Sequence, residues 1–137
     1  MARGGFYSVD SLRGVHVLVV DYEADCRDIL SAILHYCGAL VTAVDSPEAA
    51  LEVMRLIKPD VLVVDLIEGD KDGHWLIRQV RSLKPEDGGV VPIIAVSAAG
   101  SPARVARAGA AGFVACLVKP LDPWQLCRVI AGVTASS

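Results

Sequence analysis

The 137-residue sequence lacks the features that direct a chain into a membrane or onto nucleic acid. No apolar stretch approaches the roughly 18 residues of a membrane-spanning helix. The N-terminal residues Met1 to Gly5 contain no apolar core of a signal peptide. The formal net charge is −3 and there is no basic run, so nothing points to nucleic acid or to an anionic membrane. We therefore expect a cytoplasmic protein with neither kind of partner.

The sequence also lacks the spacings that are typical of zinc sites and of disulfide frameworks. Its four cysteines form no C-x-x-C pair, and its three histidines are scattered. The cysteines are Cys26, Cys37, Cys116 and Cys127. We interpret them as free, buried thiols in a reducing compartment.

Hydrophobic residues, in contrast, are abundant, at 53% of the chain. They form short continuous runs, as expected for strands of a parallel sheet that is buried on both faces. Five such runs are present: Val15–Val20, Leu40–Val44, Val61–Val64, Val90–Val96 and Phe113–Val118. A chain of this length is expected to form one domain with a core of its own.

Amphipathic segments with helix signals alternate with these runs. Gly38 predicts the end of the first helix, and Ser46-Pro47 predicts the start of the second. A third helix is expected around Leu76 to Leu83, a fourth from Ser101-Pro102 to about residue 108, and a fifth after Asp122-Pro123. The alternation predicts a single α/β domain over residues 13–134, with an N-terminal tail at 1–12 and a C-terminal tail at 135–137.

Four polar residues stand at or just after the ends of predicted strands. These are Asp21, Asp65, Ser97 and Lys119. The carboxyl ends of parallel strands share one edge of the sheet, so we expect these side chains to converge there. A carboxylate nucleophile, a second acid for a metal, a hydroxyl and an ammonium suit phosphoryl transfer to an aspartate.

In their order and spacing, the motifs resemble the receiver domain of two-component response regulators, of the chemotaxis-regulator type. The matching segments are Val17–Asp21, Pro59–Leu66, Asp72-Gly73, Pro92–Ala98 and Leu117–Pro120. The resemblance implies a doubly wound (βα)5 sandwich whose five parallel strands have the flavodoxin-like order 2-1-3-4-5. It implies a phosphorelay signalling protein rather than an enzyme.

By the same resemblance, Asp65 accepts the phosphoryl group from a histidine kinase or phosphotransfer protein. Lys119 matches the lysine that pairs with this carboxylate, and the bond to Pro120 is expected to be cis. Ser97 matches the switch hydroxyl, and Ala98 matches the small residue beside the phosphate. A downstream protein partner is implied, through the face of the fourth helix, fifth strand and fifth helix, and a homodimer is left open.

The resemblance implies a Mg²⁺ site formed by Asp21, Asp65 and the backbone oxygen of Ile67. The family has two adjacent acids after the first strand, whereas here Tyr22 stands in the second place. A protonated phenol is a poor Mg²⁺ ligand, so we expect weakened affinity unless Glu23 or Glu68 compensates.

This departure supports an alternative, a degenerate receiver that acts as a phosphorylation-independent protein-interaction module. Cys116 supports it too, because it replaces the aromatic residue or histidine that often reports the switch. An aspartate-nucleophile phosphatase is disfavoured, because Ile67 stands where such enzymes place a second aspartate.

Overall fold

A computed structural model describes residues 11–66, 72–97 and 112–134 of the chain. Five strands lie within these residues: β1 (His16–Val20), β2 (Leu40–Val44), β3 (Val61–Leu66), β4 (Ile93–Ser97) and β5 (Ala115–Val118). The helices are α1 (Ala24–Tyr36), α2 (Pro47–Leu56), α3 (Asp72–Arg81) and α5 (Pro123–Thr134), with a 3₁₀ turn at Pro85–Asp87.

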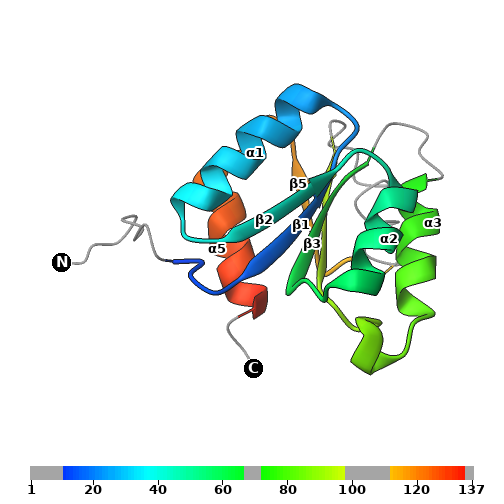
Figure 1. Cartoon of the computed structure of the whole chain (residues 1–137). Coiled ribbons are helices and arrows are strands. Elements are labelled where there is room, and N and C mark those ends of the chain that lie inside the picture. Colours follow the sequence, from blue (N-terminus) through cyan, green and yellow to red (C-terminus); the bar gives the residue numbers. More distant parts are fainter. Residues whose placement is uncertain (1–10, 67–71, 98–111, 135–137) are drawn as a thin grey trace.

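The strands form one sheet in the order β2-β1-β3-β4-β5, and every neighbouring pair is parallel. This confirms the predicted fold class and strand order. The helices α1 and α5 cover one face of the sheet, and α2 and α3 cover the other (Figure 1). The expected helix after Ser101-Pro102 lies outside the described residues.

Two hydrophobic cores lie on the two faces, because successive strand residues point to opposite sides. In β1, Val17 and Val19 contact the core under α1 and α5, whereas Leu18 and Val20 contact the core under α2 and α3. All four are buried. The continuous apolar runs of the sequence are therefore explained by a sheet that is covered on both faces.

The first helix ends as its sequence predicts. Gly38 has φ +97°, a conformation that glycine adopts without steric cost. Its N–H donates to the carbonyl of His35 at 2.9 Å, and the N–H of Ala39 donates to that of Leu34 at 3.0 Å. These two bonds form a Schellman motif, which turns the chain sharply into β2.

Some boundaries differ from the prediction. The strand expected to begin at Val90 begins at Ile93, because Pro92 has no N–H to donate to the sheet and Val90 is exposed. Leu12, which the sequence places in the N-terminal tail, is fully buried against the core under α1 and α5. Its N–H donates to the carbonyl of Cys37 at 2.8 Å.

The cysteines fall into two groups. Cys37 and Cys127 are buried, as expected, and their sulfur atoms lie 3.2 Å apart between α1 and α5. Burial and this contact raise the pKa of the Cys127 thiol to about 12. Cys26 and Cys116 are only partly buried, which corrects the interpretation of all four as buried thiols. None of the described helices is long and apolar enough to cross a bilayer.

Candidate functional site

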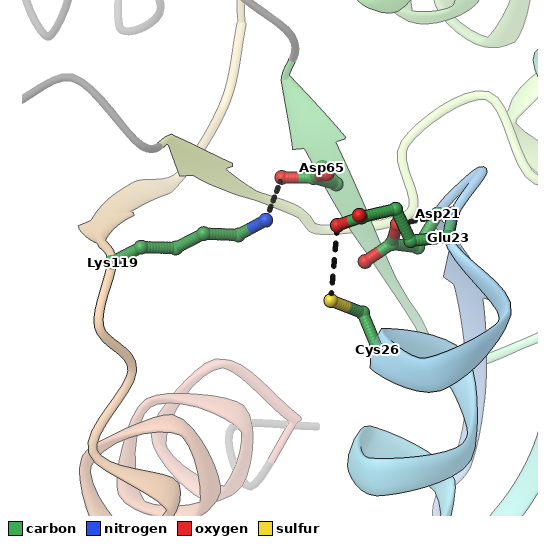
Figure 2. Close-up of polar contacts among 5 residues, drawn as sticks. All are labelled: Asp21, Glu23, Cys26, Asp65 and Lys119. Carbon is green, nitrogen blue, oxygen red and sulfur yellow. Dashed lines mark hydrogen bonds and ion pairs between the residues drawn. The ribbon is translucent and has the colours of Figure 1, made fainter.

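The structure brings the side chains of Asp21, Asp65 and Lys119 to one cavity at the carboxyl edge of the sheet, and it places the backbone of Ser97 at the same edge. Asp21 follows the last residue of β1, Asp65 is the penultimate residue of β3, and Lys119 follows β5. Ser97 ends β4, where it pairs with Leu66 of β3 on one side and Val118 of β5 on the other. Figure 2 shows the side chains of Asp21, Asp65 and Lys119 facing one another across this edge.

An ion pair between Lys119 and Asp65 lies at the centre of the site. The Nζ atom of Lys119 is 3.0 Å from Oδ1 of Asp65, and the Asp65 side chain is only 7% exposed (Figure 2). The backbone helps to position Lys119, because its N–H donates to the carbonyl of Ser97 at 2.8 Å. The peptide bond to Pro120 is cis, as the resemblance implies.

The ionisation of both partners reflects this environment. Burial raises the pKa of the Asp65 carboxyl above its ordinary value, and the ion pair with Lys119 opposes this shift without cancelling it. The charge of Asp21 adds to the increase. Burial lowers the pKa of the Lys119 ammonium, but the contact with Asp65 outweighs this, so the pKa is raised.

We expect the raised pKa of Asp65 to appear in the pH dependence of stability. The folded chain holds the Asp65 proton to a higher pH than the unfolded chain does. The free energy of unfolding contributed by this group therefore falls as pH rises from the ordinary to the raised pKa. Asp65→Asn removes the titration, so its stability relative to wild type should rise over this window and then level off. Urea unfolding of both proteins at a series of pH values from acidic to neutral measures this difference in the free energy of unfolding. A difference that does not change with pH would contradict the prediction.

Asp21 is the second acid of the site and is nearly inaccessible, at 2% exposure. Its Oδ1 atom accepts a hydrogen bond from the N–H of Glu23 at 3.0 Å. Its Oδ2 atom is buried and has no hydrogen-bond partner among the described residues. An unpaired buried carboxylate oxygen is costly and calls for a ligand.

The arrangement fits a hard divalent cation, because Asp21 and Asp65 supply carboxylate oxygens, which Mg²⁺ prefers. Tyr22 is 57% exposed, which leaves its phenol out of the buried part of the site. Glu23, the N-cap residue of α1, lies beside Asp21 (Figure 2). The other implied residues, Ile67, Glu68 and Ala98, lie outside the described residues.

Sequence reasoning missed Cys26 as part of this region. Its Sγ atom lies 3.3 Å from Oε1 of Glu23, in the first turn of α1 (Figure 2). Cys26 also lines a cavity of about 230 Å³ together with Asp21, Asp65 and Lys119. The remaining walls are mainly apolar and come from the strands, from α1 and from the turn before α5. The sequence signal that could have identified Cys26 is its position three residues after Glu23, because residues three apart are neighbours on a helix surface.

Comparisons with known proteins agree with this geometry. The model of the response regulator receiver domain family matches residues 17–131. The chain therefore belongs to the response regulator receiver domain family, the signalling module of two-component systems.

Similar full-length proteins and structures are known. An uncharacterized 14.6 kDa protein from the sodA1 3′ region of Leptolyngbya boryana is 34% identical over 122 residues, covering 89% of this chain and 92% of that protein. The two-component response regulator ORR3 of Oryza sativa subsp. indica is 32% identical over 120 residues, 84% of this chain and 90% of that protein. The chemotaxis response regulator CheY4 of Vibrio cholerae superposes with a TM-score of 0.77 at 25% identity, over 87% of this chain and 98% of that chain.

Proposed function

We propose that this receiver domain accepts a phosphoryl group on Asp65 from the phosphohistidine of a histidine kinase or phosphotransfer protein. The observation that carries the proposal is the 3.0 Å ion pair between Lys119 and the nearly buried Asp65 carboxylate. The pair holds an anionic nucleophile next to a cation that can remain with the phosphoryl oxygens after transfer.

In the proposed transfer, a carboxylate oxygen of Asp65 attacks the phosphorus atom. The new P–O bond forms as the P–N bond to the donor imidazole breaks, and the nitrogen keeps the electron pair and takes up a proton. Lys119 donates to the phosphoryl oxygens, where negative charge is concentrated. Because the step needs positioning and charge neutralisation more than covalent help, a rigid sheet edge is a suitable scaffold.

We propose that a Mg²⁺ ion is held by Asp21 and Asp65, with Glu23 compensating for Tyr22 and Ile67 and Glu68 as further candidates. When bound, the ion would neutralise charge on the phosphoryl oxygens. Support comes from the buried Oδ2 atom of Asp21, which has no partner among the described residues. Glu23 lies next to Asp21, so its carboxylate could serve as a further ligand of the cation.

The readout is proposed to be a change in affinity for a downstream protein. Ser97 ends β4 beside β5, so movement of its hydroxyl toward phosphate can be transmitted to the β5–α5 face. Val118 and Trp124 on that face are 41% and 40% exposed, as contact residues for a partner would be.

The four free cysteines suit a reducing compartment such as the cytoplasm.

Intact-mass spectrometry after incubation with a small phosphodonor tests the proposal. We expect one phosphoryl adduct that forms with Mg²⁺, is lost with EDTA, and is lost in Asp65→Ala. Asp60→Ala is a matched control, because Asp60 lies just before β3, at the end of the strand opposite to Asp65. It should keep the adduct. An adduct that survives in Asp65→Ala would overturn the assignment of the acceptor.

A second candidate is a phosphorylation-independent interaction module. The exposed Tyr22, in place of the family's second acid, is the observation that favours it. Under this candidate no adduct forms even at saturating Mg²⁺, although the chain is folded, and partner binding is the same for wild type and Asp65→Ala.

A further inference from the structure

A cluster of three metal-ligating side chains lies at one side of the site. It consists of Asp21, directly after β1, and Glu23 and Cys26 at the start of α1 (Figure 2). The candidate ligand atoms, two carboxylate oxygens and one sulfur, all lie within 4.8 Å of one another. The thiol makes this cluster chemically different from the all-oxygen set that Mg²⁺ prefers.

A second observation is that one carboxylate oxygen of the cluster is buried without a hydrogen-bond partner among the described residues. The side chain of Asp21 is 2% exposed, and its Oδ2 atom is buried without a hydrogen-bond partner among the described residues. The carboxylate extends toward Glu23 and the space above Cys26 (Figure 2). Asp21 and Cys26 also line the same cavity, so an ion would have room beside them.

We propose that Asp21, Glu23 and Cys26 form a binding site for a divalent transition metal of borderline softness, with Zn²⁺ as the representative ion. Such ions accept both carboxylate and thiolate ligands, whereas Mg²⁺ excludes sulfur. A tetrahedral ion with bonds of about 2.0 Å to oxygen and about 2.3 Å to sulfur places these two atoms roughly 3.5 Å apart. The Cys26 thiol donates a hydrogen bond to Oε1 of Glu23 with the two atoms 3.3 Å apart, close to that separation, so a bound ion would take the place of the shared proton.

Binding exchanges a proton for the metal. The Cys26 thiol loses its proton to solvent as the bond from sulfur to the metal forms, with no change in oxidation state. Three protein ligands leave a fourth position for water, as in open zinc sites. Because the site uses Asp21, a bound transition metal would compete with Mg²⁺ for that carboxylate. The binding itself requires no phosphoryl transfer to Asp65.

The test is a titration of the reduced full chain with CoCl₂, followed by displacement with ZnCl₂. Cobalt bound to a thiolate gives a charge-transfer absorption that oxygen ligands alone do not give. We expect this band in wild type, its loss in Cys26→Ser, and its retention in Cys116→Ser, the matched control with a partly buried thiol on β5. Half-saturation of the band should require at least about tenfold more Co²⁺ in Glu23→Gln, which keeps the thiol but weakens the ligand set.

Three results would overturn the inference: no band in wild type, a band that persists in Cys26→Ser, or a band that is lost only in Cys116→Ser. Circular dichroism shows whether each variant is folded, and Glu23→Gln changes an exposed residue, so it remains informative if Cys26→Ser is unfolded. Asp65→Ala separates this inference from the proposed function. If Asp65→Ala shows the cobalt band and wild type forms no phosphoryl adduct, only the proposed phosphoryl acceptance is contradicted. If wild type forms the adduct normally but shows no cobalt band, only the metal site is contradicted.

Discussion

Lys119→Met is expected to slow phosphoryl acceptance by Asp65 by about 100-fold or more, the usual cost of removing one preorganised electrostatic group from a reacting centre. Lys119 is the cation that lies 3.0 Å from the Asp65 carboxylate. Methionine fills a similar volume without a charge, so the change removes the ion pair while largely keeping the packing. Since Lys119 opposes the increase in the pKa of Asp65, that pKa should rise further in the variant.

The measurement is the rate of adduct formation by intact-mass spectrometry at fixed Mg²⁺ and phosphodonor. Lys84→Met is the matched control, since Lys84 is exposed just before the 3₁₀ turn at Pro85–Asp87, outside the site. Its rate should equal that of wild type. A Lys119→Met rate within a few-fold of wild type would show that the ion pair has no part in the transfer.

Leu126→Ala is expected to lower the free energy of unfolding by about 2–5 kcal/mol, the range for removing a buried leucine side chain. Leu126 lies on α5, is fully buried, and belongs to the core that joins α5 and α1 to the sheet. The truncation leaves a cavity that the surrounding strands can fill only in part. Much of the stability of a domain of this size would be lost, because the total is usually about 5–15 kcal/mol.

Urea denaturation monitored by circular dichroism gives this value, with Leu56→Ala as the matched control. Leu56 is also a helical leucine, at the end of α2, but it is 85% exposed. Its truncation should change stability by no more than about 0.5 kcal/mol. Similar losses for the two variants would contradict the description of α5 as a core helix.

Local patterns in the sequence predict much of the fold because they reflect short-range physics. Gly38 stops α1 because few other residues adopt its backbone conformation, and the Ser46 side chain caps α2 through a bond from the N–H of Ala49 at 3.1 Å. Apolar runs predict buried parallel strands because both faces must be covered. The meeting of Asp21, Asp65 and Lys119 follows from the rule that parallel strands end at one edge.

Local patterns are therefore sufficient to predict the alternation of strands and helices, the receiver motifs and the edge at which the polar residues meet. Features that depend on contacts between distant segments could be found only from the packed chain. Leu12 is buried because the backbone of Cys37 and the core under α1 and α5 lie beside it, which no local pattern encodes. Likewise Cys26 becomes part of the site only because the start of α1 places its sulfur next to the carboxylates. Burial and proximity are properties of the packed chain, whereas periodicity and turn chemistry are properties of short segments.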